Sequence, residues 1–429
     1  MVHQMMNNKI NRAAKASRKR SSMLVNPSIF RRLTGLSILA LLVSCGSPPK
    51  APTSPDPAIP VPDIGADALP ADEAVSAAWA RMLAWDERLP LPSAATRPSA
   101  VWRPVHWVQL PGVQRDAIEA LLPSWLRTCE RAPAPLAPWC SQVRLLSMQP
   151  APTRVQWLVK EWQPYALETL DGSSKGLLTG YFEPQLRASR LPDAQHTVPL
   201  HGLPAGWRQG EVWYSRRDMD ALPAAQDALS GRELVWLQDP IDALIVQIQG
   251  SGRVLVTEPD GQVRTIRLAF AGHNGQTYGS VGRWLLDRGA VSNAHWSDIR
   301  AWAKANPGQV QQMLWSNPRV VFFREEPLNG MDAMAGPKGA QGVPLTPLRS
   351  IAVDRDSIPY GTPVWMATPG PTVNTQRWVM AQDTGGAIKG AVRADYFTGW
   401  GDEARDVASS LKQPLELWAL WPRRLAPPR

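Results

Sequence analysis

The sequence predicts a mainly β protein that begins with helices, and the period of its apolar residues is the first observation behind this prediction. In residues 71–149, apolar side chains recur every three or four positions, as in 73–83 and 114–122, which is the spacing of amphipathic helices. From residue 176 onward, short apolar runs are bounded by Gly, Pro and Asp, which is typical of strands. Strands so short and so closely spaced favour a barrel or a sandwich over a parallel doubly wound sheet.

The same patterns predict the individual elements. The Gly- and Pro-rich segment 329–345 is expected to be a loop that connects two parts of the chain. About 360 residues follow residue 70, which is enough for two domains. We expect helices at 280–288 and 296–305, and strands at 176–182, 244–249, 253–257, 263–270, 319–324, 348–354, 363–367, 377–382 and 415–420.

The first 44 residues have the composition of an export signal. They contain eight Lys and Arg residues and no Asp or Glu, and their apolar run at 33–43 is too short to span a bilayer. Small residues ahead of Cys45 resemble the lipobox of bacterial lipoproteins. We therefore expect cleavage before Cys45, acylation of its thiol, and anchoring on the periplasmic face of the outer membrane, because Gly46 rather than Asp follows. The alternative is an ordinary signal peptide with a chance cysteine.

The charge of the mature chain gives no argument for nucleic acid as a partner. The full chain has a net charge of +9, but removal of the eight basic residues of the leader leaves 38 Lys and Arg against 37 Asp and Glu. A strongly basic pI that comes from a leader does not describe the folded protein. No nucleic-acid partner is therefore expected.

Two features of the mature chain concern its attachment and its thiols. Residues 46–70 contain eight prolines, a composition that favours an extended spacer and predicts a tether at 45–70. Cys129 and Cys140 would lie in an oxidising compartment, where they form either a disulfide across a short loop or two buried thiols. Both alternatives stay open, and neither implies catalysis.

Several common kinds of active site are missing from the sequence. The six histidines are scattered without the spacing of zinc ligands, so no metal is expected. Gly250-Ser251-Gly252 lacks the flanking residues of a nucleophile elbow, and no dinucleotide-binding or phosphate-binding glycine motif is present. We therefore expect no cofactor.

Three aspartates stand out because each lies in or just after a predicted strand and beside a turn. Asp354 precedes Ser-Ile-Pro-Tyr-Gly-Thr, Asp383 precedes Thr-Gly-Gly-Ala-Ile-Lys-Gly, and Asp395 lies in Val-Arg-Ala-Asp-Tyr-Phe. Carboxylates placed in this way can converge on one cleft, since glycine lets the backbone approach a ligand closely. Taken singly, each aspartate is more simply explained as the cap of a turn.

Taken together, residues 381–401 closely resemble the three-aspartate domain of the membrane-bound lytic murein transglycosylase A family. The resemblance covers residues 176–421, whereas 71–149 is similar only as a helical lead-in. Four other segments are similar to the family and follow its order: Leu-Thr-Gly-Tyr-Phe-Glu-Pro at 178–184, Val-Gln-Ile-Gln-Gly-Ser-Gly-Arg at 246–253, Phe-Ala-Gly-His-Asn-Gly-Gln-Thr-Tyr-Gly-Ser-Val-Gly at 270–282, and Asn-Pro-Arg-Val-Val-Phe-Phe at 317–323.

The resemblance implies a double-psi β-barrel domain with an inserted second β-domain and a glycan-binding groove between them. The strand pattern is compatible with this topology but does not predict it by itself. The implied organisation is a signal peptide at 1–44, a lipidated tether at 45–70, helices and the first barrel strands at 71–183, the inserted domain at 184–329, and the C-terminal part of the barrel at 330–425.

The resemblance also implies a peptidoglycan lytic transglycosylase. Such an enzyme cleaves the β-1,4 bond between N-acetylmuramic acid and N-acetylglucosamine, and the muramic acid C6 hydroxyl attacks its own C1 to leave a 1,6-anhydro end. With an internal nucleophile, one carboxyl suffices as general acid and then as base, and the motif assigns this role to Asp395. Asp383 and Asp354 would raise the pKa of Asp395 or orient it. Asp383 as the acid, and a purely structural role for Asp354 or Asp383, are the alternatives.

Candidate glycan-binding residues are the polar, aromatic and glycine residues of the matched segments, because sugars bind to aromatic faces and to amide or hydroxyl groups. For Phe323, packing in the core is the stronger interpretation, and most of the 20 tryptophans are also expected in the core. Lys389 either meets a muramyl carboxylate or is exposed, and Glu183, Asp402 and Glu403 are interpreted as structural or solvated. The candidates are Thr179, Gly180, Tyr181, Gln249, Ser251, Tyr278, Phe323 and Thr384.

Two other classes of protein stay open. One is a glycoside hydrolase that uses two of the aspartates around a water, and the other is a non-catalytic cell-wall-binding lipoprotein, which would be expected to lack the acid. The expected partners are peptidoglycan glycan strands, outer-membrane lipid through the acylated Cys45, and other cell-wall enzymes.

Overall fold

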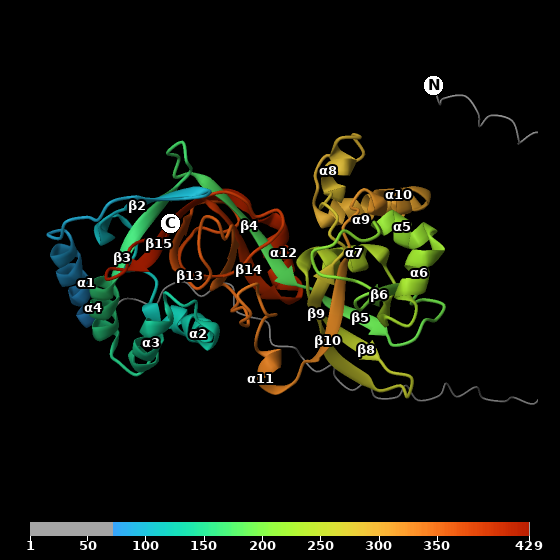
Figure 1. Ribbon diagram of the computed structural model, residues 1–429, viewed down its shortest axis with the longest axis horizontal. Coiled ribbons are helices and arrows are strands. Elements are labelled where there is room, and N and C mark those ends of the chain that lie inside the picture. Colours follow the sequence, from blue (N-terminus) through green and yellow to red (C-terminus); the bar gives the residue numbers. More distant parts are fainter. Residues whose placement is uncertain (1–71, 429) are drawn as a thin grey trace, which may run out of the picture. The chain divides into compact units, whose positions relative to one another are not determined.

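A computed structural model describes residues 72–428 (Figure 1). Cys45, the predicted leader and the predicted tether lie outside these residues. The described chain contains a nine-stranded and a six-stranded sheet, with four helices in its N-terminal part. The predicted fold class, mainly β with N-terminal helices, is therefore confirmed. No helix within residues 72–428 is long and apolar enough to cross a bilayer.

The N-terminal helices share one hydrophobic core with the larger sheet, and tryptophans fill much of it. Trp125 packs edge-on against Trp162 of the sheet at 5.1 Å between ring centroids. The helix predicted at 114–122 begins only at Ile118, because Asp116 instead pairs with Arg349 and accepts the N–H of Trp378. The elements are α1 (Glu73–Asp86), β1 (Ala95–Arg97), β2 (Ala100–Pro104), α2 (Ile118–Thr128), α3 (Cys140–Leu146) and α4 (Ala151–Glu161).

Six strands of the larger sheet close into a ring, called the barrel below. Their order is β15-β12-β13-β11-β14-β4, and β4 pairs with β15 to complete the ring. The pairs β11–β13 and β14–β4 are parallel, and the other pairs of the ring are antiparallel. The strands are β4 (Gly176–Glu183), β11 (Ser350–Val353), β12 (Pro363–Thr368), β13 (Thr375–Asp383), β14 (Arg393–Trp400) and β15 (Lys412–Pro422), with β3 (Trp162–Glu168) on the outer side of β15 and α12 (Gly401–Ser410) between β14 and β15.

The second sheet, called the insert below, comes entirely from the chain between β4 and β11. Its strand order is β10-β9-β8-β5-β7-β6, and Leu200, Val254 and Leu268 lie fully buried in its core. Its strands are β5 (Gln185–Ser189), β6 (Val198–His201), β7 (Glu233–Leu237), β8 (Gly252–Thr257), β9 (Val263–His273) and β10 (Val321–Pro327). The helices in or just after it are α5 (Arg216–Ala221), α6 (Pro223–Leu229), α7 (Pro240–Gln249), α8 (Val281–Leu286), α9 (Trp296–Ala305), α10 (Val310–Trp315) and α11 (Gly330–Ala333).

One predicted strand is wrong, because residues 244–249 form the second half of helix α7. The helix begins with strong local signals, since the Asp239 side chain accepts the N–H of Ile241 and Pro240 occupies the first turn. It ends at Gly250, whose φ of +83° is the left-handed conformation that closes many helices. A short continuous apolar run fits a buried strand or a buried helix equally well, and here the start and stop signals decide.

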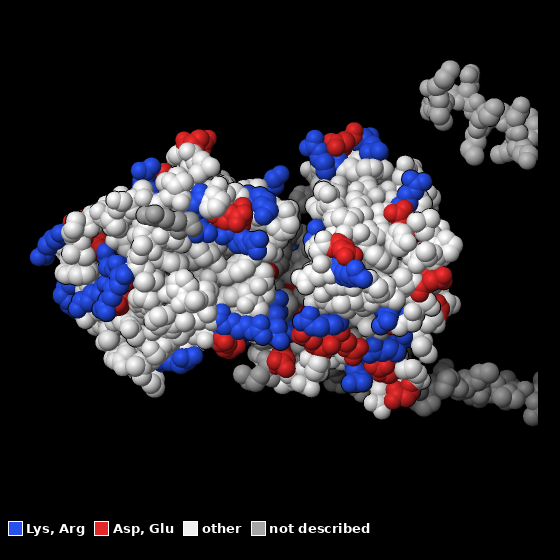
Figure 2. All heavy atoms as spheres, in the orientation of Figure 1, with Lys and Arg blue, Asp and Glu red and all other residues white. Residues whose placement is uncertain are grey.

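The barrel and the insert are joined by a buried ionic group at the end of β4. Glu183 is fully buried and accepts from Arg253 Nε at 2.7 Å and from Arg267 Nε at 2.6 Å, so a carboxylate of the barrel is bound by two strands of the insert. Arg253 also lies over the ring of Trp400, 3.7 Å from its centroid. These contacts fix the point where the chain passes from one sheet to the other, and Figure 2 shows the furrow between the two parts.

Candidate active site

The strand register brings two of the three aspartates to either side of one residue. Ala352 of β11 pairs with Asp395 of β14 on one side and with Asp383 of β13 on the other. Neighbouring strands lie about 4.8 Å apart, so the two aspartate backbones are separated by about 10 Å. Asp354 lies just beyond the end of β11, two residues after Ala352. All three aspartates therefore lie at one end of adjacent barrel strands.

Asp395 occupies the face of β14 that is turned away from the barrel core. Its neighbours Ala394 and Tyr396 belong to that core, whereas Asp395 is partly buried and accepts a hydrogen bond from the Thr179 hydroxyl on β4. Thr179 in turn accepts from Arg393 Nη2 at 2.8 Å. Burial raises the pKa of Asp395, and the Thr179 hydrogen bond and the Arg393 charge oppose this rise. The carboxyl group thus retains its proton to a higher pH than an exposed aspartate does.

Asp383 is also partly buried, and hydrogen-bond donors surround its carboxylate. The Tyr181 hydroxyl donates to Oδ2 at 2.9 Å, and the Ala340 N–H donates to Oδ1 at 2.8 Å. The pKa of Asp383 is raised to about 6, and burial is the largest cause. The charge of Asp395 also raises this pKa, whereas the two hydrogen bonds and that of the Thr384 N–H lower it. Burial, followed by Asp383 and Asp395, also raises the pKa of Tyr181 well above its ordinary value. The two carboxylates and this tyrosine form one electrostatic group.

Asp354 holds the glycine-rich loop 384–390 that follows Asp383. It is buried and accepts the N–H of Gly390 at 2.9 Å and that of Asp356 at 3.1 Å. At the start of the same loop, the Thr384 hydroxyl donates to the Val353 carbonyl at 2.8 Å. Lys389 lies 3.7 Å from Asp354, but its side chain is 66% exposed. The loop is therefore fixed to the end of β11 at both of its ends.

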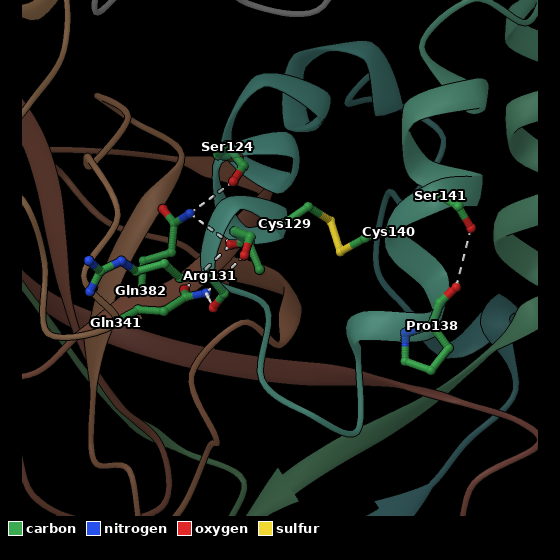
Figure 3. Close-up of a disulfide and its surroundings, with 9 residues drawn as sticks. Ser124, Cys129, Arg131, Pro138, Cys140, Ser141, Gln341 and Gln382 are labelled. Atoms are coloured by element: carbon green, nitrogen blue, oxygen red, sulfur yellow. Dashed lines mark hydrogen bonds between the residues drawn. A yellow bond between two sulfur atoms is a disulfide. The ribbon is translucent and has the colours of Figure 1, made fainter.

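Helix α2 supports the chain next to Asp383, and Figure 3 shows Gln382 hydrogen-bonded to Ser124 of this helix. Gln382, which precedes Asp383, donates to the Ser124 carbonyl at 2.8 Å and to the Thr128 hydroxyl at 2.9 Å. Gln341, which follows Ala340, donates its N–H to the Gln382 carbonyl at 3.0 Å and its side-chain amide to the Thr128 carbonyl at 3.3 Å. Gln341 and Gln382, which are adjacent in sequence to Ala340 and Asp383, are thereby both attached to the end of α2.

A disulfide bond ties this end of α2 to the next helix. Cys129 follows Thr128, and it is bonded to Cys140 at the start of α3 (Figure 3). Of the two alternatives that the sequence left open, the structure has the bonded pair. The disulfide reduces the freedom of the helix end that binds Gln341 and Gln382.

Two further candidates, Gly180 and Gln249, lie on the opposite side of β4 from Asp395. A Cβ on Gly180 would come within 2.7 Å of Ala408 Cα, so glycine allows α12 to pack closely on the strand. The Gln249 side chain accepts the N–H of Phe182 at 3.1 Å. A small cavity of about 150 Å³ lies here, lined by Gly180, Phe182, Gln249, His295, Trp296 and Ser409 among others.

The other candidates from the insert make no hydrogen bond to the three aspartates within residues 72–428. Ser251 is buried, and Phe323 is 1% exposed and packs in the core of the insert. Tyr278 is 39% exposed in the segment between β9 and α8. Eleven of the twenty tryptophans are buried, as expected for core residues, and the other nine are partly buried.

Sequence reasoning missed three groups that contact the aspartates or their hydrogen-bond partners. Arg393 lies on the same face of β14 as Asp395, so alternation along the strand was a usable signal. Tyr360 lies beside Thr384; burial raises the pKa of Tyr360, Thr384 lowers it, and Asp383 and Asp354 raise it by smaller amounts. Ala340 acts through its backbone N–H, for which its side chain gives no signal. Within residues 72–428, no three His, Cys, Asp or Glu side chains are close enough together to hold a metal ion.

Models of two protein families match the two parts of this site. The MltA specific insert domain matches residues 177–324, and the 3D domain matches residues 349–421. The first match covers the insert as far as residue 324 in β10, and the strands β11, β13 and β14 at the aspartate end of the barrel lie within the second. This combination defines the class of the protein as a lytic transglycosylase with the 3D barrel and the MltA insert.

Individual relatives agree with this class. Membrane-bound lytic murein transglycosylase A of Vibrio cholerae is 31% identical over 288 residues, which cover 62% of this chain and 73% of that protein. The solved structure of the lytic transglycosylase LtgG of Burkholderia pseudomallei is 42% identical, with a TM-score of 0.51 over 78% of this chain and 98% of that chain. The structure of E. coli MltA with bound chitohexaose is 25% identical, with a TM-score of 0.58 over 78% and 95% of the two chains. The chain belongs to the membrane-bound lytic murein transglycosylase A family.

Proposed function

We propose that this protein is a peptidoglycan lytic transglycosylase that cleaves the β-1,4 bond between N-acetylmuramic acid and N-acetylglucosamine and leaves 1,6-anhydromuramic acid ends. The observation that carries the proposal is the Asp395 carboxyl, which is partly buried beside Thr179 and has a raised pKa. The relative that was solved with chitohexaose supports a β-1,4-linked glycan as the ligand class.

In the proposed reaction, Asp395 serves first as a general acid and then as a general base. Its proton passes to the glycosidic oxygen as the bond from that oxygen to muramic acid C1 breaks. The C6 hydroxyl oxygen of the same sugar attacks C1, and its proton passes to the Asp395 carboxylate. The acid is thereby restored, and no water is consumed. A raised pKa suits this role because the group must begin protonated.

The neighbouring residues position and tune this acid. Thr179 orients the Asp395 carboxyl through its hydroxyl, and Arg393 holds Thr179. Asp383, when ionised, stabilises the positive charge that develops at C1 in an oxocarbenium-like transition state. Asp354 acts indirectly, because it fixes the loop that begins at Thr384. The alternative, a glycoside hydrolase that uses two carboxylates, would use the same aspartates. Its products would have reducing ends, which distinguishes it from a lytic transglycosylase.

The test is a digestion of purified sacculi followed by mass spectrometry of the released muropeptides. We expect products lighter by one water, with anhydro ends. Asp395→Asn should lower their release by at least about 100-fold and should still pellet with murein. Asp402→Asn is the matched control, because Asp402 is 87% exposed on α12, and it should release products at the unaltered rate.

Three outcomes would contradict parts of the proposal. Release of muropeptides with reducing ends alone would identify a hydrolase. Binding to murein without any released product would identify a non-catalytic cell-wall-binding protein. Full activity of Asp395→Asn, with loss of activity in Asp383→Asn, would transfer the acid role to Asp383.

We also propose that Cys45 carries the lipid that anchors the protein in the outer membrane. Relatives of this protein are named membrane-bound, and no helix of residues 72–428 could span a membrane. Incorporation of labelled palmitate should occur in the full chain and disappear in Cys45→Ser, and the variant should leave the outer-membrane fraction. Retention of the label in Cys45→Ser would contradict this assignment.

A further inference from the structure

On the side of the insert that faces the barrel, one guanidinium group has no counter-ion among residues 72–428. Arg319 precedes β10 and is partly buried. In the described part of the chain, its side chain donates one hydrogen bond, from Nη1 to the Gln276 carbonyl at a long 3.4 Å. Within residues 72–428, no carboxylate lies at ion-pair distance from it. A partly buried charge without a partner is unfavourable unless something binds to it.

The backbone of Arg319 is held in place by another arginine. Arg216 donates to the Asn317 carbonyl at 3.0 Å and to the Arg319 carbonyl at 2.8 Å. The Arg319 N–H in turn donates to the Asn317 side chain at 3.2 Å. These bonds fix the backbone from which the Arg319 side chain extends. A fixed backbone reduces the entropy that is lost when the side chain binds a ligand.

The guanidinium of Arg319 reaches the glycine-rich loop of the barrel. A Cβ placed on Gly386 would lie 3.9 Å from Arg319 Nη1. Gly386 comes three residues after Asp383, in the loop that Asp354 fixes through Gly390. The cation of the insert therefore stands opposite the barrel segment that carries the candidate active site.

Among residues 72–428, no negative charge influences the pKa of Arg319. Burial lowers the pKa of Arg319, and no acidic neighbour offsets this effect. His273, the nearby titratable group, has its pKa lowered by burial and by Arg319, and its Nδ1 accepts the N–H of Gly275. Both features favour the neutral imidazole. Arg190 of the same insert shows the contrast, because Glu258 and Glu325 bind it.

We propose that Arg319 binds a carboxylate of the glycan substrate and so distinguishes murein from an uncharged chitin chain. This inference rests on the proposed function and names the substrate feature that the same groove recognises. A guanidinium matches a carboxylate with paired hydrogen bonds. The carboxylate has two sources, the lactyl group of a peptide-free muramic acid and the stem peptide of a substituted one. N-acetylglucosamine oligomers contain neither.

The test measures the binding of three tetrasaccharides by calorimetry in an Asp395→Asn background, which prevents turnover. They are a murein tetrasaccharide with stem peptides, the same glycan after amidase treatment, and chitotetraose. Arg319→Gln should weaken at least one murein ligand about tenfold and leave chitotetraose unchanged. Arg319→Lys should restore part of the loss. Arg208→Gln is the control, because Arg208 is 77% exposed on the insert, and it should change none of the affinities.

Each outcome decides the inference. A loss confined to the amidase-treated glycan assigns the lactyl carboxylate, and a loss confined to the substituted glycan assigns the stem peptide. Unchanged binding of both murein ligands, or an equal loss for chitotetraose, would overturn the role of Arg319. Failure of the proposed function would be seen in the sacculus digestion instead, where the unaltered enzyme would release no products with anhydro ends.

Discussion

Glu183 and the Asp383–Asp395 group are two carboxylate sites in the same barrel, and their surroundings differ in one respect. Glu183 is fully buried, and Arg253 and Arg267 both bind it. Asp383 and Asp395 are less completely buried, and neither forms an ion pair with an arginine or lysine within residues 72–428. Hydroxyl and backbone N–H groups are their partners instead.

This difference separates a structural carboxylate from a candidate acid. Two adjacent cations compensate the buried charge of Glu183, whereas burial without such a partner raises the pKa of Asp383 and of Asp395. Burial alone therefore does not indicate a catalytic carboxyl in this protein. The informative feature is the absence of a direct cationic partner in the described chain. Substitutions at Glu183 and at the Asp383–Asp395 group can test it.

The largest effect is expected at the structural site. Glu183→Gln leaves Arg253 and Arg267 buried without their anion, and breaking a buried pair in this way costs about 3–5 kcal/mol of unfolding free energy. Chemical denaturation at pH 7 measures this loss. Glu416→Gln is the control, because the partner of Glu416 is Lys175, whose side chain is 73% exposed, and the variant should cost less than about 1 kcal/mol. Equal losses in the two variants would remove the distinction.

A smaller effect of opposite sign is expected for Asp383→Asn. The pKa of Asp383 rises from 3.8 to about 6 on folding, so its contribution to stability is complete below pH 4 and is lost as the pH rises through 6. Two pKa units correspond to about 2.7 kcal/mol, and partial exposure reduces this to about 1–2 kcal/mol. The variant should therefore gain that much relative to the unaltered protein between pH 4 and pH 7.

Urea unfolding of both proteins at the two pH values checks this prediction, because other titrating groups cancel in the difference. Asn keeps one acceptor oxygen for the Ala340 N–H, and its NH2 group can donate to the Tyr181 hydroxyl oxygen, which limits other changes. A difference between the two proteins that does not depend on pH would show that Asp383 has an ordinary pKa.

The next effect concerns the pH profile of activity. The positive charge of Arg393 lowers the pKa of Asp395, so Arg393→Gln should raise this pKa. The proposed acid must be protonated, and activity falls as the pH rises through its pKa. The alkaline limb of kcat/KM should therefore move to higher pH. Arg405→Gln on α12 is the control, and a shift to lower pH in Arg393→Gln would contradict the assignment of Asp395.

The smallest effect is expected at Lys389. Its ion pair with Asp354 is long and its side chain is largely exposed, so Lys389→Ala should change the unfolding free energy by less than about 0.5 kcal/mol. Denaturation curves measure this change. A loss above about 2 kcal/mol would show that a cation does contribute to holding the aspartate end of the barrel, and the comparison with Glu183 would weaken.

Local patterns predicted eight of the fifteen strands in residues 72–428, but not their pairing. Strands β11 and β13 were among the predicted ones, whereas β14, which carries Asp395, was not, and the family resemblance connected its motif with the other two. The hairpin β1–β2 was also missed, since three to five residues give little periodicity and the pairing of β2 with β3 is a long-range contact. The strand predicted at 244–249 failed because apolar content outweighed the cap signals of α7.

The support of the site was hidden from sequence for a related reason. Gln341, Gln382 and Thr128 come from three distant segments, and nothing local in any of them indicates the others. Ala340 contributes its backbone N–H, and the residue type at this position does not indicate that role. Arg319 lay inside a matched segment, but its lack of a counter-ion is a property of the folded surroundings only.

The pairing of β4 with β15 also determines when the site can form during folding. The six strands of the insert are contiguous between residues 185 and 327, so its sheet needs no later part of the chain. The ring, in contrast, closes only when Thr179 pairs with Lys412, and such distant pairings form slowly. Thr179 is the residue that hydrogen-bonds Asp395. We therefore expect the insert to fold early, and a nascent or truncated chain that lacks β15 to remain without an organised acid.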